Sequence, residues 1–249
     1  MILELDCGNS FIKWRILSSA TGLVSLAGVD ECAQGLALAL AKLEGVQFRA
    51  CRLVSVRGEA ETASLCRQLA SLLGVDVVVA QPARELAGVS NGYEDFSRLG
   101  MDRWLAVLGA YQLSAGAALV LDLGTAITAD YIQADGRHLG GFICPGLPLM
   151  RDQLGSHTRR VRYSLNEIDP ALGVDVPGRS TADAVERGCL QMLQSFVLRQ
   201  VSEAKRLLGD NCSIYLTGGD AGLVSDLIPG ACVTPDLVFV GLSVACPLD

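Results

Sequence analysis

Two short segments of the sequence combine an aspartate, a glycine and a hydroxyl residue directly after an apolar run. They are Asp6-Cys-Gly-Asn-Ser10 near the start of the chain and Asp122-Leu-Gly-Thr125 near its middle. A carboxylate at the end of a buried strand is costly unless it binds a cation or several donors. Glycine allows a ligand to approach the backbone closely, and the amides of such a turn can hold phosphate oxygens. Each segment therefore predicts a strand, a phosphate- and metal-binding turn and a returning strand, although Asp and Gly also build plain turns.

The spacing of the two turns predicts a duplicated architecture. Almost half of the 249-residue chain separates Asp6 from Asp122. Around each turn, apolar strand patterns alternate with helical patterns, such as the one over Glu59 to Leu73 that ends at Gly74, and this order is typical of α/β folds. We expect an N-terminal lobe at 1–115 and a C-terminal lobe at 116–249, each offering one turn to a shared cleft.

Composition limits the class of protein. The formal charge of −7 and the pI near 4.9 argue against a general nucleic-acid or anionic-membrane surface. Nine cysteines without a Cys-x-x-Cys pair indicate free thiols in a reducing cytoplasm, and the two histidines, His138 and His157, match no zinc spacing. No signal peptide is predicted, and the uncharged stretch 104–121 is broken by polar residues into a helix and a strand.

Two further polar segments lie at predicted element ends. They are Gly100 to Arg103, at the start of a helix, and Thr217 to Ala221, after a strand. Strand ends of an open α/β sheet converge on one crevice, where ligands bind. Glycine amides, acids for a cation and the cationic Lys13 are the parts that phosphoryl transfer requires. The sequence has no P-loop motif and no Gly-x-Gly-x-x-Gly after a strand.

Paired Asp-x-Gly turns with a late Thr-Gly-Gly-Asp resemble the actin, hexokinase and acetate-kinase superfamily. Within it, five ordered motifs resemble the type III pantothenate kinases and span nearly the whole chain. They are Asp6-x-Gly-Asn-Ser-x-x-Lys13, Leu99-Gly-x-Asp-Arg-Trp104, Asp122-x-Gly-Thr-Ala-x-Thr128, Gly140-Gly-x-Ile-x-Pro-Gly146 and Thr217-Gly-Gly-Asp220. The resemblance implies two similar lobes of the actin/hexokinase (ribonuclease H-like) type, each a mixed sheet flanked by helices, with a nucleotide cleft between them.

The same resemblance implies the ligands of individual residues. ATP and its phosphates would be bound by Asp6, Cys7, Gly8, Asn9, Ser10, Phe11, Ile12, Lys13, Thr125, Gly218, Gly219 and Asp220. Pantothenate would be bound by Tyr93, Gly100, Met101, Asp102, Arg103 and Thr181, with Asp102 as the general base. Asp122 would ligate an activating monovalent cation, K⁺ or NH₄⁺, and Asp6 would lie near Mg²⁺. The family is dimeric, so a homodimer is expected.

The sequence departs from the family pattern at two positions, and each assignment has a structural alternative. Ser10 stands where Thr is usual, and Asp95-Phe96 replaces the usual Asn-Pro. Asp102 and Thr181 could be helix caps. Arg103 could form a surface ion pair, Tyr93 could only pack under its loop, and Gly218 and Gly219 could serve close packing.

The segment 155–180, with Arg159, Arg160 and Arg162, has little pattern and is either a lid or a long connection. Its arginines could be a solvated face.

We therefore expect a cytoplasmic enzyme that transfers the γ-phosphate of ATP to the primary hydroxyl of pantothenate, the first step towards coenzyme A. Other hypotheses are a kinase of the same superfamily acting on a sugar or another small hydroxy acid, a non-catalytic nucleotide-binding regulator, and a phosphatase on the same scaffold. A phosphatase would activate water and need no organic acceptor.

Overall fold

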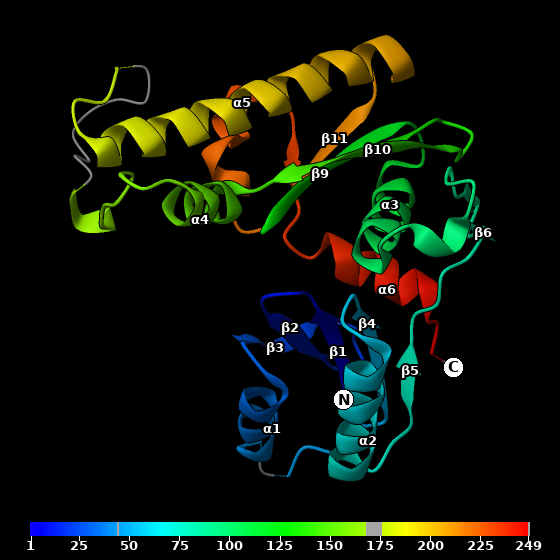
Figure 1. Ribbon diagram of the computed structural model, residues 1–249. Helices are drawn as coiled ribbons and strands as arrows, with labels where there is room; N and C mark the ends of the chain where they lie inside the picture. The colour runs from blue at the N-terminus through cyan, green and yellow to red at the C-terminus, as the bar shows by residue number, and fades with distance from the viewer. Residues whose placement is uncertain (44, 168–175, 249) are drawn as a thin grey trace. The chain divides into compact units, whose positions relative to one another are not determined.

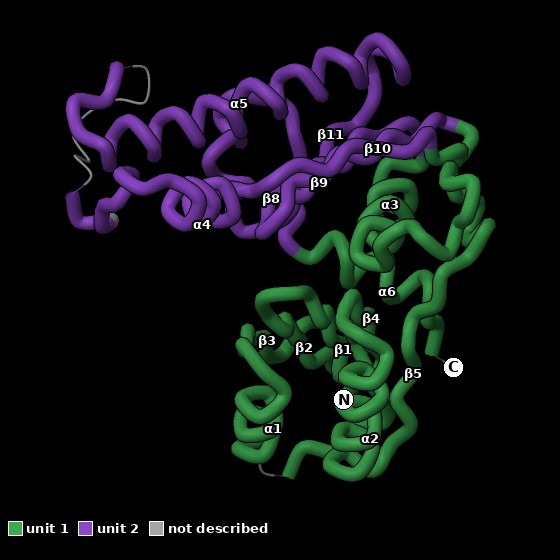
Figure 2. The backbone as a smooth tube through the Cα atoms, in the orientation of Figure 1, with its two compact units in different colours: residues 1–115, 135–138, 236–249 green, residues 116–134, 139–235 purple. Residues whose placement is uncertain are grey.

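The computed structural model describes residues 1–43, 45–167 and 176–248, which group into two compact units (Figure 2). Unit 1 comprises Met1–Ala115, Asp135–His138 and Asp236–Asp249, and unit 2 comprises Gly116–Ala134 and Leu139–Pro235. The units do not follow one boundary along the chain, because two later segments group with unit 1. The continuous lobes 1–115 and 116–249 stay a prediction. Part of the segment 155–180, residues 168–175, lies outside the described residues, so the lid also stays a prediction.

Each unit is built on a mixed sheet (Figure 1). The sheet of unit 1 has the order β3-β2-β1-β4-β5, with bounds β1 Ile2–Cys7, β2 Ile12–Leu17, β3 Val24–Asp30, β4 Ala50–Ser55 and β5 Val77–Val79. The second sheet has the order β10-β9-β8-β11-β12, with bounds β8 Ala118–Leu123, β9 Ala126–Ile132, β10 His138–Pro145, β11 Ser213–Thr217 and β12 Cys232–Val233. The strand that comes first along the chain, β1 or β8, is central in its sheet, so the predicted α/β fold with two similar mixed sheets is confirmed.

The two aspartates occupy equivalent positions in these sheets. Asp6 is the next-to-last residue of β1, and Asp122 is the next-to-last residue of β8. Each central strand runs antiparallel to the strand that follows it, so Asp6 pairs with Lys13 and Asp122 pairs with Thr128. Each also runs parallel to a later strand, β4 or β11. Both acids therefore lie at the carboxyl edge of a parallel strand pair, where such sheets bind ligands.

Strand β1 has two different faces because successive side chains point to opposite sides of a sheet. Its residues Leu3, Leu5 and Cys7 are buried in a core that also contains Leu36 of α1 (Ala33–Ala41) and Leu65 of α2 (Glu59–Leu73). Helix α2 has the predicted bounds and ends at Gly74, whose φ of 69° is left-handed. The alternate residues Glu4 and Asp6 therefore face the opposite side of the sheet.

Helices α3 (Met101–Ser114) and α6 (Leu237–Ala245) pack closely against each other in unit 1. Two glycines allow this approach: a Cβ atom at Gly109 would lie 2.5 Å from the carbonyl oxygen of Leu237, and one at Gly241 would lie 1.9 Å from that of Leu105. No larger side chain fits there without moving a backbone. Helix α6 thus supports the helix on which Asp102 and Arg103 lie.

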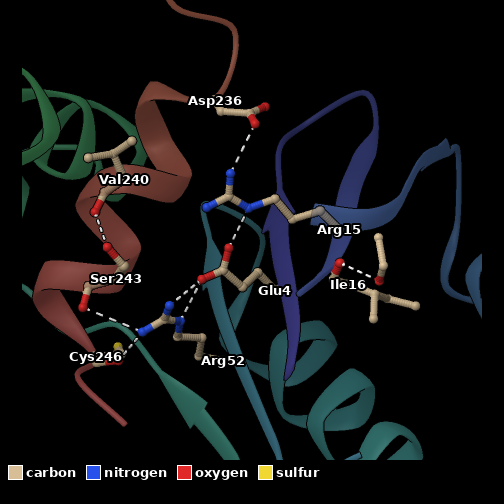
Figure 3. A network of polar contacts seen from close by, with 9 residues as sticks. Glu4, Arg15, Ile16, Arg52, Asp236, Val240, Ser243 and Cys246 are labelled. Carbon is tan, nitrogen blue, oxygen red and sulfur yellow. Dashed lines mark hydrogen bonds and ion pairs between the residues drawn. The ribbon is translucent and has the colours of Figure 1, made fainter. Parts of the chain in front are cut away.

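A buried ionic network joins the sheet of unit 1 to α6 (Figure 3). Glu4, which is 0% exposed, accepts hydrogen bonds from Arg15 Nε at 2.5 Å and from Arg52 Nε at 2.7 Å. Arg15 also contacts Asp236 at 2.9 Å, and Arg52 donates to the carbonyl oxygen of Cys246 at 2.6 Å. Because the two arginines contact both ends of α6, the network fastens the C-terminal helix to β1, β2 and β4.

In unit 2, helix α5 (Thr181–Leu208) covers one face of the sheet and α4 (Leu147–His157) lies beside it (Figure 1). Apolar residues of α5, such as Leu193 and Val197, share a core with Leu119 and Leu121 of β8. Within the described ranges, no helix combines the length and apolar composition needed to cross a membrane.

Candidate functional site

The first turn, Gly8–Phe11, connects β1 to β2 and carries four of the eight predicted ATP-binding residues of unit 1. Asn9, Ser10 and Phe11 are exposed, while Cys7 and Ile12 are buried and anchor the ends of the turn. The turn therefore presents an accessible backbone on a fixed base. Burial raises the pKa of the Cys7 thiol to about 12, so this residue acts as a neutral packing group.

Asp6 lies in an environment that disfavours its charge. Burial raises the pKa of its carboxyl from 3.8 to about 6, Lys13 opposes this shift, and the negative charge of Asp102 adds to it. The structure thus brings Asp6, Lys13 and Asp102 into one electrostatic group within unit 1. A carboxylate destabilised in this way is suited to a nearby cation, which would restore its ionised form.

Asp102 lies in the first turn of α3, and the N-cap of that helix is Gly100. The alternative that Asp102 is itself the cap is therefore wrong. Its Oδ1 accepts a hydrogen bond from the backbone N–H of Arg103 at 2.8 Å. The N-terminal end of a helix favours a negative charge, so this position suits a carboxylate.

Arg103 and Tyr93 form one contact pair. The Arg103 Nη1 donates to the hydroxyl of Tyr93 at 2.7 Å, and its guanidinium lies 5.5 Å from the centre of the tyrosine ring. The Arg103 residue is 5% exposed, so it is not a surface ion pair. A buried planar guanidinium beside a phenol is suited to the carboxylate of a small organic acid.

The loop that carries Tyr93 is held by hydrogen bonds of its own side chains. Asn91 Oδ1 accepts from the Tyr93 N–H at 3.0 Å, and Asp95 Oδ1 accepts from the Ser97 N–H at 3.1 Å and its hydroxyl at 2.6 Å. The last two bonds lower the pKa of Asp95. Asp95 thereby caps a short 3₁₀ helix, Phe96–Arg98, so this departure from the family pattern still gives an ordered turn.

His138 is a neighbour of this loop that the sequence did not indicate. It is 1% exposed, its ring is stacked on Tyr93 with centroids 6.4 Å apart, and its Nδ1 accepts from the Gly92 N–H at 3.4 Å. The adjacent Gly136 accepts a hydrogen bond from Ser90 at 3.0 Å. No motif could have indicated His138, because its segment reaches the loop only through folding.

Predicted nucleotide- and cation-binding residues of unit 2 lie around the turn after β8. The Asp220 N–H donates to the carbonyl oxygen of Leu123 at 2.9 Å, and the Gly146 N–H donates to that of Thr125 at 3.0 Å. A Cβ atom at Gly218 would lie 2.5 Å from Asp122 Oδ1. The Asp122 and Thr217–Asp220 motifs, far apart in sequence, are therefore adjacent, and Gly218 serves close packing there because no side chain fits so near the carboxylate.

Asp220, Gly219 and Thr181 complete the predicted set in unit 2. Burial raises the pKa of Asp220, and Arg151 opposes that shift. Gly219 is exposed, with no other atom within 4 Å of a Cβ built on it. Thr181 is the exposed first residue of α5, and the cap is the neighbouring Ser180, whose hydroxyl accepts from the Asp183 N–H at 3.1 Å. Thr181 is therefore not needed as the helix cap.

The donor set is compatible with Mg²⁺ held partly by substrate phosphates. Among the residues that the structure describes, no three His, Cys, Asp or Glu side chains form a metal cage of their own. Magnesium commonly uses one or two carboxylates together with phosphate oxygens and water. The raised pKa of Asp6 fits such a carboxylate, because its charge is under-compensated within the protein itself.

Comparison of the sequence with known proteins gives consistent results along the chain. A family model described as type III pantothenate kinase matches residues 2–203. Proteins named type III pantothenate kinase from Pseudomonas putida and Ectopseudomonas mendocina are 56% and 58% identical over 249 residues, and each alignment covers 100% of both chains.

Solved structures resemble the fold at lower sequence identity. A structure described as a Baf family transcriptional activator from Campylobacter jejuni has a TM-score of 0.61 at 20% identity, covering 97% of this chain and 95% of the other. A structure described as a 2-dehydro-3-deoxygalactonokinase from Sinorhizobium meliloti has a TM-score of 0.57 at 17% identity, covering 98% of both. Because their sequence identities are low, these two structures support the fold assignment and no function. The match to the family model and the identity to full-length relatives identify the chain as a member of the type III pantothenate kinase family.

Proposed function

We propose that the protein transfers the γ-phosphate of ATP to the primary hydroxyl of pantothenate, forming 4′-phosphopantothenate and ADP in the first step of coenzyme A synthesis. Its family membership makes it a phosphotransferase. The observation that carries the proposal is the place of Asp102 at the start of α3, near enough to Asp6 for its negative charge to help raise the pKa of that carboxyl. It brings a candidate base for the acceptor alcohol to the turn proposed to hold the phosphates.

In the proposed reaction, the hydroxyl oxygen of pantothenate forms a bond to the γ-phosphorus while the bond to the β-phosphate oxygen breaks. Asp102 accepts the hydroxyl proton as the new bond forms. Lys13 offsets the negative charge on the transferred group, and the amides of the turn Gly8–Phe11 orient the phosphates. Arg103 binds the carboxylate of pantothenate, and Tyr93 keeps the guanidinium in orientation through the bond described above.

The remaining site assignments belong to the same proposal. Thr125 and Gly218 to Asp220 bind the nucleotide, and Gly100, Met101 and Thr181 bind pantothenate. Asp6 lies near Mg²⁺, which when bound neutralises phosphate charge. Asp122 binds a monovalent cation, K⁺ or NH₄⁺; its support is the place of this carboxylate at the carboxyl edge of β8, next to the Thr217–Asp220 motif.

We further propose a cytoplasmic homodimer. The nine cysteines of the chain are free thiols, which agrees with a reducing compartment. Sedimentation analysis tests the dimer directly, and a single species of monomer mass would contradict it.

The decisive experiment is a coupled ADP-release assay, run with and without pantothenate, in potassium and in sodium buffers. Release that requires both pantothenate and potassium is the expected result. Release without an acceptor would instead indicate hydrolysis. A panel of sugars and other hydroxy acids completes the test, since preference for one of these over pantothenate would contradict the substrate assignment.

A further inference from the structure

We propose that Arg57 is a positioning residue for the phosphate turn, because its guanidinium holds the carbonyl oxygen of Gly8 and thereby sets the direction of the next backbone amide. The inference rests on the proposed function, since it assigns Arg57 to the turn that would hold ATP. It concerns a residue outside all five motifs of the sequence.

Strand pairing brings Arg57 to the turn. In the parallel register of β1 with β4, Cys7 lies opposite Ser55, and the Val56 N–H continues the ladder by donating to the carbonyl oxygen of Cys7 at 3.1 Å. One residue further along both segments, Arg57 Nε donates a hydrogen bond to the carbonyl oxygen of Gly8 at 2.8 Å. This bond has the length of a charge-assisted hydrogen bond.

Fixing one carbonyl fixes the amide that follows it. The chain has no cis peptide bond in its described residues, and in a trans peptide the C=O and N–H groups point in opposite directions. With the oxygen of Gly8 directed at Arg57, the N–H of Asn9 points to the other side of the peptide. Asn9 and Ser10 are exposed, so this is the accessible part of the turn. Arg57 therefore aims a donor outward without itself contacting the phosphate.

Arg57 is held on its other side by α2. Its Nη1 donates to Glu61 Oε1 at 2.7 Å, and its own N–H donates to the Ser55 hydroxyl at 3.2 Å. That hydroxyl is 2.7 Å from the hydroxyl of Thr62, also on α2. The Arg57 side chain is only 11% exposed. Because these contacts already restrict the conformations of the Arg57 side chain, little further conformational entropy is lost when the turn binds a ligand. Arg57 is therefore pre-organised.

The positive charge of Arg57 also acts electrostatically on the turn. It opposes the rise in the pKa of Cys7 that burial and Asp6 produce. Arg57 is therefore a positive charge behind the turn, complementing Lys13, which extends from β2. Removing it would both release the peptide and lower the positive potential at the turn.

Binding of a non-hydrolysable ATP analogue, measured by calorimetry, tests the proposal. We expect Arg57→Met to weaken binding about 10-fold, through loss of one charge-assisted bond, while the KM for pantothenate stays within about twofold. Arg57→Lys keeps the charge but has no guanidinium fork, so an intermediate loss is expected. Arg67→Met, at an exposed arginine on α2, is the matched control and should bind as the unaltered protein does.

A chemical rescue separates positioning from general stability. A cavity of about 210 Å³ lies beside Arg57 and is lined by Ser55, Glu61 and Thr62, so a small cation can enter. Millimolar methylguanidinium should restore nucleotide binding to Arg57→Ala and leave the Arg67→Met control unchanged.

Unaltered nucleotide affinity in Arg57→Met, or equal weakening for nucleotide and pantothenate, would overturn the inference. Absence of rescue would do the same. If the unaltered protein binds ATP but does not phosphorylate pantothenate, the proposed function fails while the binding experiment on Arg57 still stands.

Discussion

Asp6 and Lys13 are direct cross-strand partners in the register of β1 with β2. The opposite charges lie on either side of the same turn, and yet the pKa of Asp6 is raised to about 6, because burial outweighs the attraction of Lys13 and Asp102 adds repulsion. The free protein therefore holds a carboxylate that is not fully compensated.

The first prediction concerns pH and Asp6. Its pKa is about 6 in the folded protein and 3.8 as the ordinary value, so the folded state binds the proton more tightly. Protonation of Asp6 therefore stabilises the folded state. This contribution is complete below pH 3.8 and is lost as the pH rises through 6. Asp6→Asn should therefore raise the unfolding free energy of the nucleotide-free protein by up to about 3 kcal/mol well above pH 6. Urea denaturation at several pH values measures this, and an equal gain below pH 3.8 would contradict it.

The second prediction concerns the proposed base. Asp102→Asn should lower kcat by ~10²–10⁴ while leaving nucleotide affinity nearly unchanged, because the amide cannot accept the proton of the acceptor alcohol. Single-turnover kinetics measure the chemical step itself. Asp76→Asn, at an exposed position in the same unit, is the control for loss of one negative charge. Undiminished turnover in the Asp102 variant would remove that residue from the mechanism.

The third prediction separates binding from chemistry at Tyr93. Tyr93→Phe removes the 2.7 Å bond to Arg103 but keeps the aromatic ring. The KM for pantothenate should rise roughly 3- to 10-fold, with a smaller change in kcat and none in the KM for ATP. Arg103→Lys should have a larger effect, since an ammonium cannot bind a carboxylate in the same planar fashion. Steady-state kinetics with each substrate varied in turn check both, and a change confined to ATP would argue against the assignment.

The fourth prediction compares two adjacent glycines. Gly218 has a φ of +87°, and a Cβ atom there would lie 2.4 Å from the Leu123 oxygen and 2.5 Å from Asp122 Oδ1. Gly218→Ala should lower the unfolding free energy by about 2 kcal/mol or more and weaken activation by potassium. Gly219→Ala, where nothing lies within 4 Å, should change that free energy by less than about 0.5 kcal/mol. Thermal and urea denaturation distinguish the two, and similar losses at both positions would contradict the packing argument.

The fifth prediction concerns the buried network around Glu4. Glu4→Gln should destabilise the protein by about 3–5 kcal/mol, because it leaves Arg15 and Arg52 without their buried counter-charge. Asp236→Asn, at a carboxylate that is 54% exposed, should cost less than about 1 kcal/mol. Hydrogen exchange should show faster exchange in α6 for the Glu4 variant. Unchanged protection of α6 would mean that the network does not fasten that helix.

The sequence alone indicated the local part of this architecture. The strand–turn–strand segments around Asp6 and Asp122, the helix Glu59–Leu73 and its end at Gly74 follow from alternating side chains and from glycine, which act within a few residues. The presence of two similar lobes could be inferred because the same pattern occurs twice. The candidate acids and glycines were visible for the same reason.

The remaining features depend on contacts between segments that are distant in the chain. The sequence does not reveal that α6 returns to the N-terminal sheet, that Arg57 reaches Gly8, or that His138 stacks on Tyr93. Each of these contacts depends on the register of strands or on the close approach of two helices, as at Gly109 and Gly241. Only the folded chain determines such register and approach, because their free energy comes from burial shared by residues with no common local pattern.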